Sequence, residues 1–159
     1  MKSIMRKYLL FSFCLLLIAG ISFGQSKQKT PVKPTESAFK KLVSGTGLPF
    51  KMINDSLAVI PYEGENIASY NVLIQKVNDL YIVYTNLTEA LPGKINDTKF
   101  KYLLQKNNDF DLIKIGLESS DNTVYVRADI FKSVTTVGLM TRVIKQVANV
   151  TNIIAGDLK

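Results

Sequence analysis

The sequence predicts an α+β domain: an antiparallel sheet of five to six strands with a short N-terminal helix, a middle helix and a long C-terminal helix packed on it. Three observations support this fold class. Short apolar runs separated by turn residues are typical of antiparallel strands. Two such runs within residues 111–128 are joined by a four-residue turn, which is a hairpin pattern. Residues 133–154 carry apolar side chains at helical spacing. The length of 159 residues fits one domain.

The start of the chain is typical of a secretory signal peptide. Three basic residues, the last of them Lys7, precede an uncharged apolar run over residues 8–23, and small residues at positions 22 and 24 fit cleavage before Gln25. The run is shorter than the roughly 20 residues that a membrane-spanning helix needs. We therefore predict a signal peptide over residues 1–24 and export to the periplasm or the medium. A signal that is kept as a membrane anchor is the alternative.

The predicted mature chain is mildly basic and carries no thiol. The only cysteine, Cys14, lies in the signal, so we expect no disulfide. Loss of the three basic signal residues lowers the formal net charge from +7 to +4. The sequence has no run of five or six basic residues, which argues against a nucleic-acid partner. Residues 25–34 contain two prolines and are predicted to form a flexible linker. The single α+β domain then spans residues 35–159.

The first part of this domain is predicted to contain one helix and four strands. Thr35 or Ser37 can cap the helix, and Gly45 and Gly47 end it. The predicted strands are residues 49–53, 57–60, 69–77 and 80–85. Pro61 ends the second strand. Apolar side chains on both faces of the fourth strand indicate a central position in the sheet.

The second part is predicted to contain a helix, a hairpin and the long helix. Asp97 or Thr98 can cap the middle helix, which ends near Gln105. Strands over residues 111–118 and 123–128 form the hairpin. In the last helix, residues 133–154, one apolar stripe consists of Met140, Val143, Ile144, Val147 and Ile154, with Arg142 and Lys145 off the stripe. Because many of its residues are β-branched, this helix must gain its stability from docking the stripe on the sheet.

The residue types exclude most catalytic chemistry. The chain has no histidine, which excludes a Ser-His-Asp triad and histidine-based zinc sites. It also lacks a glycine-rich phosphate-binding loop. The remaining candidates are two carboxylate pairs, Glu63 with Glu65 and Asp109 with Asp111, because a glycosidase-type hydrolase needs two carboxylates across a cleft. We therefore predict no catalytic, cofactor-binding or metal-ligating residues, no cofactor, and no enzymatic activity.

The element order and several segments of the second half resemble a known superfamily. The segments are Leu87–Pro92 ahead of the middle helix, Leu103–Asn108 at its end, the strand Lys114–Leu117, the turn Ser119–Asn122, the strand Val124–Val126 with Ala128–Ile130, and the closing amphipathic helix. On these segments the mature chain resembles the type III secretion chaperone-like superfamily, including YbjN-like domains. The resemblance covers nearly all of residues 35–154. It implies a compact α+β domain, often a dimer, that holds or docks against another polypeptide.

These observations predict an exported, non-enzymatic, chaperone-like protein-binding domain of the bacterial envelope. Its expected partner is another polypeptide or a second copy in a homodimer, with no nucleic acid and no stable membrane insertion after signal cleavage. The outward residues Lys114, Tyr125 and Arg127 are the predicted docking surface. Two alternatives stay open. One is a carrier of a small hydrophobic ligand or lipid between the sheet and the helix over residues 140–154. The other is a carboxylate-dependent hydrolase.

Overall fold

The computed structural model describes residues 36–87, 96–118 and 123–159. The predicted signal peptide, the predicted linker and the predicted hairpin turn over residues 119–122 lie outside the described residues. The elements along the chain are α2 (Ala38–Gly45), β1 (Lys51–Asn54), β2 (Leu57–Tyr62), β3 (Tyr70–Val77), β4 (Leu80–Asn86), α4 (Asp97–Lys106), β5 (Lys114–Leu117), β6 (Val124–Phe131), the short 3-10 helix η1 (Lys132–Val134) and α5 (Val137–Asp157).

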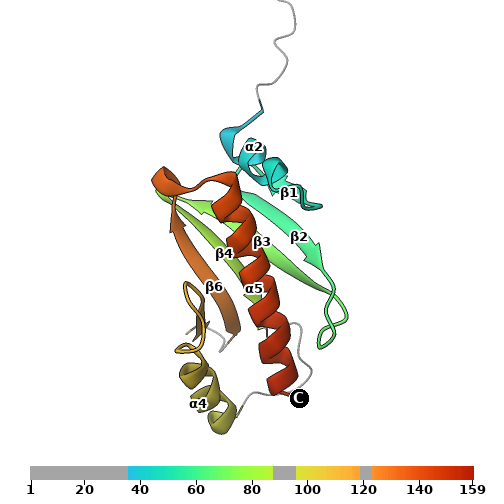
Figure 1. Cartoon of the computed structure of the whole chain (residues 1–159), viewed down its shortest axis with the longest axis vertical. Helices are drawn as coiled ribbons and strands as arrows, with labels where there is room; N and C mark the ends of the chain where they lie inside the picture. The colour runs from blue at the N-terminus through green and yellow to red at the C-terminus, as the bar shows by residue number, and fades with distance from the viewer. Residues whose placement is uncertain (1–35, 88–95, 119–122) are drawn as a thin grey trace, which may run out of the picture. The chain divides into compact units, whose positions relative to one another are not determined.

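The strands form one six-stranded antiparallel sheet in the order β1-β2-β3-β4-β6-β5 (Figure 1). The predicted α+β class, with a short first helix, a middle helix and a long last helix, is therefore confirmed. β4 lies between β3 and β6, as the apolar residues on both of its faces predicted. β4 pairs with β6 along its whole length, so the hairpin of β5 and β6 extends the sheet that β1 to β4 begin.

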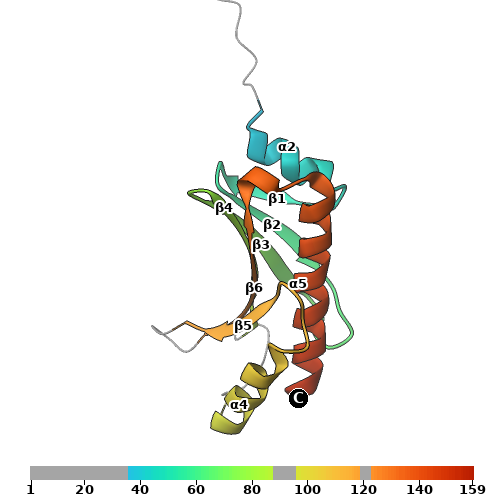
Figure 2. The ribbon, with the colours of Figure 1, turned by 60° about the vertical axis from the view of Figure 1, so that its left-hand side comes forward.

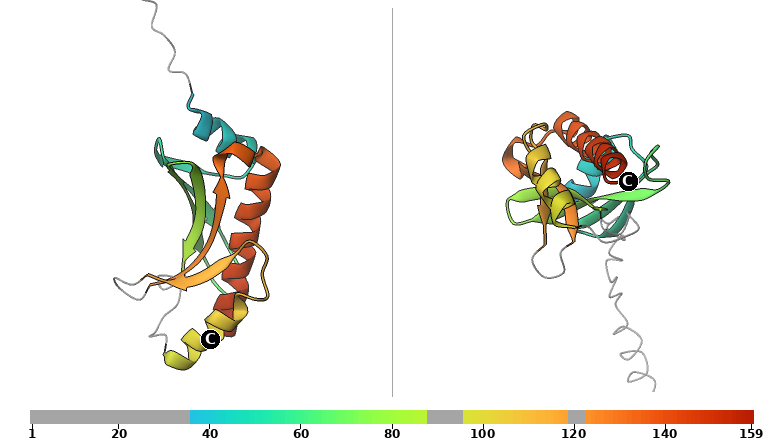
Figure 3. Two further views of the ribbon diagram at one scale, coloured as in Figure 1. Left: turned by 90° about the vertical axis from the view of Figure 1, so that its left-hand side faces the viewer. Right: turned by 90° about the horizontal axis from the view of Figure 1, so that it is seen from below.

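α5 lies along one face of this sheet and contacts β3, β4 and β6 (Figure 2). α2 lies near the start of α5 and α4 near its end (Figure 3). α4 is held there by Lys99, whose ammonium donates to the backbone carbonyl of Leu158 at 2.5 Å, and by a hydrogen bond from Tyr102 to Asp157. A cation near the last carbonyls of a helix also interacts favourably with its dipole. None of the described helices has the length and hydropathy of a membrane-spanning segment.

The predicted apolar stripe of α5 forms the centre of the core. Its five members, Met140, Val143, Ile144, Val147 and Ile154, each have 0% of their surface exposed. Their neighbours cover these side chains completely, and packed protein interiors have few voids. The carrier alternative needs a ligand cavity between this stripe and the sheet, and the complete burial of the stripe argues against one among the described residues.

Two tyrosines add polar and aromatic contacts to the same interface. The buried Tyr70 hydroxyl on β3 donates to the carbonyl of Ala148 on α5 at 3.0 Å. Burial raises the pKa of this hydroxyl above its ordinary value, so the donor keeps its proton throughout the neutral range. The Tyr81 ring on β4 stacks on Phe39 of α2 with the ring centroids 5.7 Å apart. These contacts connect the sheet to both neighbouring helices.

The helix starts depart from the prediction in two places. Ser37 caps α2 as expected, but Asn96, not Asp97 or Thr98, caps α4, and its side chain accepts from the N–H of Lys99 at 3.0 Å. Asp97 instead lies in the first turn, where its charge complements the helix dipole. α5 begins at Val137 rather than Ser133, because Thr136 provides the cap.

Three strand boundaries also differ. Pro61 does not end β2, which continues to Tyr62. β1 pairs with β2 only as far as Val59, so beyond that residue β2 is an edge strand. An edge strand tolerates proline, because no neighbouring strand needs its missing N–H. β6 continues three residues past the predicted end at Ala128, and its residues alternate between buried and half-buried as far as the exposed Phe131. β5 begins at Lys114 rather than Asp111, because Leu112 has a φ of 64°, which no regular strand contains.

The packing predicts a sharp contrast between two isoleucines of α5. Truncation of the fully buried Ile144 to alanine should lower the free energy of unfolding by about 2–5 kcal/mol, because it leaves a cavity in the core. The same truncation at Ile153, which is 36% exposed, should change it by less than about 0.5 kcal/mol. Urea denaturation of the two variants measures both values, and equal losses would show that α5 does not dock as described.

Candidate protein-docking face

The sheet has a second face that no described helix covers. Strand side chains alternate between two faces, so the residues between the core positions point away from α5. We define this set as the open face: Leu57, Val59, Leu73, Gln75, Val77, Leu80, Ile82, Tyr84, Asn86, Lys114, Gly116, Tyr125, Arg127, Asp129 and Phe131. None of these residues is fully buried, and most are half-buried. The open face is therefore an apolar surface with charged groups on it.

The three residues predicted for docking lie together on the open face. Lys114 on β5 is the direct register partner of Arg127 on β6, and Tyr125 lies two residues further along, opposite Gly116. Antiparallel strands place such neighbours within contact distance. The alternation of apolar and polar residues in the hairpin was sufficient to predict that these side chains face outward. Their use in docking remains a prediction.

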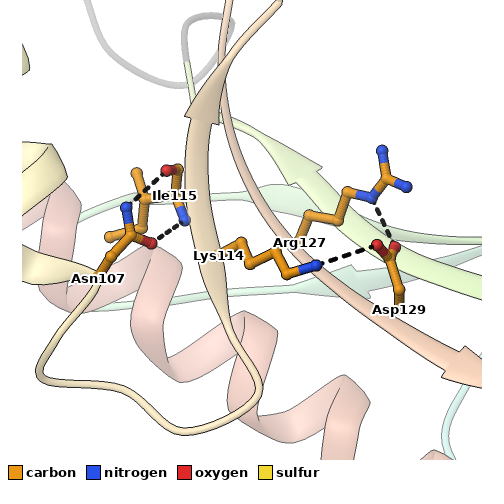
Figure 4. A network of polar contacts seen from close by, with 5 residues as sticks. All are labelled: Asn107, Lys114, Ile115, Arg127 and Asp129. Carbon is orange, nitrogen blue, oxygen red and sulfur yellow. Dashed lines mark hydrogen bonds and ion pairs between the residues drawn. The ribbon is translucent and has the colours of Figure 1, made fainter.

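A carboxylate between the two cations organises this region (Figure 4). Arg127 Nε donates to Asp129 Oδ1 at 2.6 Å, and Lys114 Nζ lies 3.6 Å from Asp129 Oδ2. The Asp129 side chain is only 22% exposed, whereas that of Lys114 is 70% exposed. The Lys114 pair is therefore screened by solvent and contributes little to stability. The shorter and less exposed Arg127 bond fixes the guanidinium on the sheet surface.

Tyr125 lies over a glycine of the neighbouring edge strand. A Cβ at Gly116 would be 2.5 Å from Tyr125 Oη and 2.6 Å from its Cζ. The ring therefore occupies the space that a side chain at Gly116 would need, which is the aromatic rescue of an edge glycine. Glycine at this position allows Tyr125 to lie across β5 instead of projecting into solvent.

A hollow of about 350 Å³ lies on the open face beside these residues. Its lining comes from four strands and their ends: Gln75, Ile82, Tyr84, Asn86, Glu118, Thr123, Tyr125 and Arg127. The docking surface predicted from the sequence did not include β3 and β4. The sequence of β4 nevertheless pointed to it, because this strand carries apolar side chains on both faces and only one face can meet α5.

The carboxylates considered for hydrolysis do not form a site. Glu63 and Glu65 lie in the loop between β2 and β3, and Asp109 and Asp111 in the loop between α4 and β5. All four are exposed, and Asp109 pairs with Lys106 at 2.9 Å. Glycosidase chemistry needs two carboxyl groups on opposite sides of a cleft, and these four side chains are exposed to solvent in two loops. In the described part of the chain, no cluster of three or more Cys, Asp or Glu residues could hold a metal ion.

Comparison with known proteins gives likeness in fold but not in sequence. No family model matches the chain, and no curated protein matches it. Among solved structures, a chain of the heterodimeric complex ExoU–SpcU from the type III secretion system of Pseudomonas aeruginosa aligns with a TM-score of 0.53 at 14% identity, covering 75% of this chain and 96% of that one. A chain of the ExsC–ExsE complex aligns with a TM-score of 0.54 at 12% identity, and the alignment covers 74% of this chain and 88% of that one.

These alignments support the predicted resemblance at the level of fold. The chain therefore shares its fold with chains of two solved complexes, one of them from a type III secretion system, while the YbjN-like likeness stays a prediction. The alignments span most of each neighbour, so the likeness concerns whole domains rather than one hairpin. At such low identity, fold likeness does not carry over function.

The contact between Gly116 and Tyr125 yields a test of the open face. Gly116→Ala should lower the free energy of unfolding by about 1–3 kcal/mol, because the added methyl group overlaps the Tyr125 ring. In a Tyr125→Ala background the same substitution should cost much less, and a double-mutant cycle in urea measures this coupling. Gly138→Ala is the control, because its new Cβ would meet Thr136 Oγ1 at an ordinary 3.9 Å. Equal costs in both backgrounds would contradict the described position of Tyr125.

Proposed function

We propose that this chain is a non-enzymatic, chaperone-like domain that binds another polypeptide on its open face. The observation that carries the proposal is the uncovered apolar sheet surface, with Leu73, Ile82 and Tyr84 half-buried next to the ionic cluster of Arg127 and Asp129. Contiguous apolar surface with a polar rim is typical of protein interaction sites. The fold likeness to chains of the ExoU–SpcU and ExsC–ExsE complexes supports the same assignment.

The energetics of the open face favour a polypeptide partner over a small ligand. Phe131 at one end of the face is 59% exposed, and the apolar residues of the neighbouring strands keep part of their surface in water. Full burial of a large apolar side chain contributes about 1.5–3 kcal/mol. Covering several such half-exposed side chains at once requires a partner that spans several strands. The hollow of about 350 Å³ would then receive one anchoring side chain of that partner.

Tyr125 and Arg127 are proposed to anchor the partner, and Lys114 to orient it. Arginine and tyrosine are among the residue types enriched at interface hot spots. Arg127 is also held in place by Asp129, so a partner would lose little side-chain entropy in contacting it. Lys114 lies at the rim, where charge contributes mainly to association rate and specificity.

We further propose that the domain works outside the cytoplasm, in the bacterial envelope. The support is the order of basic residues, apolar run and small residues in the first 24 positions. An exported binding domain without cysteines cannot rely on disulfides, and the fully buried core of α5 and the sheet provides the needed stability.

Site-specific photocrosslinking tests the docking surface. A benzophenone amino acid in place of Tyr84 or Tyr125 should crosslink the partner in the native host, because both side chains lie on the open face. The same amino acid in place of Lys145, on the outer side of α5, is the matched control and should give no such product. The partner identified by mass spectrometry is then purified for a binding measurement.

With the purified partner, Arg127→Ala and Phe131→Ser should each weaken binding by about tenfold or more, as expected for groups at a desolvated interface. Lys145→Ala should change the Kd by less than about twofold. If the partner crosslinks from position 145 and not from position 84 or 125, or if neither open-face variant weakens binding, the assignment to the open face is wrong.

Export has its own measurement. In the native host the protein should be recovered from the periplasm or medium with Gln25 as its N-terminal residue, which Edman sequencing or intact mass identifies. Leu16→Arg, which places a charge in the apolar run, should leave the protein in the cytoplasm, whereas Lys27→Ala should not. Recovery of full-length wild-type protein from the cytoplasm would refute export, and recovery from the membrane fraction would support the anchor alternative.

A further inference from the structure

β5 is an edge strand of the sheet, and its outer edge is occupied by one side chain. Asn107, the residue that follows α4, accepts a hydrogen bond from the backbone N–H of Ile115 at 2.6 Å through its Oδ1. Its Nδ2 donates to the backbone carbonyl of the same residue at 2.9 Å (Figure 4). One amide therefore satisfies both backbone groups of Ile115, as a residue of a neighbouring strand would do.

The strand register shows that these groups face away from the sheet. Backbone groups of successive residues in an antiparallel strand point alternately to opposite sides. In β5, the backbone groups of Lys114 and Gly116 point toward β6, where they lie opposite Arg127 and Tyr125. The N–H and carbonyl of Ile115 therefore point away from β6, to the open edge of the sheet. Without Asn107 these groups would be available to another extended chain, which is the hazard that every exposed sheet edge carries.

The sequence of β5 is compatible with itself in the antiparallel direction. If two copies paired with Ile115 opposite Ile115, Lys114 of one copy would lie opposite Gly116 of the other, so no like charges would be directly opposite each other. Leu117, which is 40% exposed, would lie diagonal to Ile115 of the other copy. A second copy of this chain is therefore the occupant that best fits this edge.

We infer that the Asn107 side chain is an edge guard that closes β5 to pairing with a second copy of this chain. The guard is a side chain rather than a covering strand, so a single substitution removes it. It also directs a polypeptide partner to the open face, because the β5 edge offers no free hydrogen-bonding groups at Ile115. The inference concerns self-association and does not depend on whether the proposed docking function is correct.

Sedimentation velocity of the purified protein tests the guard. Asn107→Ala should form a larger species whose fraction rises with protein concentration. Wild type should keep one mass over the same range, as should the control Asn108→Ala, which changes an exposed neighbour. The Ile115 amide of the dilute Asn107→Ala protein should exchange with deuterium about ten- to a hundredfold faster than in wild type, because its acceptor is lost.

A second substitution separates the guard from a purely structural role. Leu117→Lys adds a charge to the edge and should return Asn107→Ala to the wild-type mass, because a charged edge residue opposes strand pairing. If Asn107→Ala does not fold, Asn107→Asp takes its place, since it keeps the acceptor for the Ile115 N–H but loses the donor to the carbonyl. An unguarded variant that keeps the wild-type mass at every concentration, or an assembly that Leu117→Lys does not reverse, would overturn the inference.

Discussion

The docking of α5 on one face of the sheet is the interaction on which the rest of the structure depends. The helix is rich in β-branched residues and has little intrinsic stability, while its stripe is fully buried against β3, β4 and β6. The sheet in turn needs that stripe, since a sheet with one apolar face must cover it. α2 and α4 complete the cover at the two ends of α5. All of this packing uses a single face of the sheet.

One-sided cover leaves a second face whose residues must remain stable in water without a packed partner. The open face manages this with half-buried side chains, an arginine fixed by Asp129 and a tyrosine lying over Gly116. The edge beyond it is closed by the Asn107 amide. These features keep the surface ordered while leaving its apolar groups available. The proposed binding role therefore rests on the sheet face that the core does not use, rather than on any catalytic constellation.

The elements that sequence reasoning predicted correctly are those set by strong local patterns. The α5 stripe from Met140 to Ile154 and the outward direction of Tyr125 and Arg127 follow from periodicity alone. The errors arose where a neighbour decides the outcome. Pro61 stays in β2 because β1 has already ended, and β6 extends to Phe131 because β4 continues beside it. Local propensity contains no information about either neighbour.

By itself, the sequence determined the α+β class, the order of the elements, the buried face of each long element and the absence of histidine-based chemistry. Only the tertiary structure decided that β5 is an edge strand, and that Lys114, Arg127 and Asp129 meet. It also decided that Asn107 closes the edge at Ile115. The physical reason is that periodicity depends on neighbours along the chain, whereas strand order, ion pairs and edge protection depend on residues that only the fold brings together.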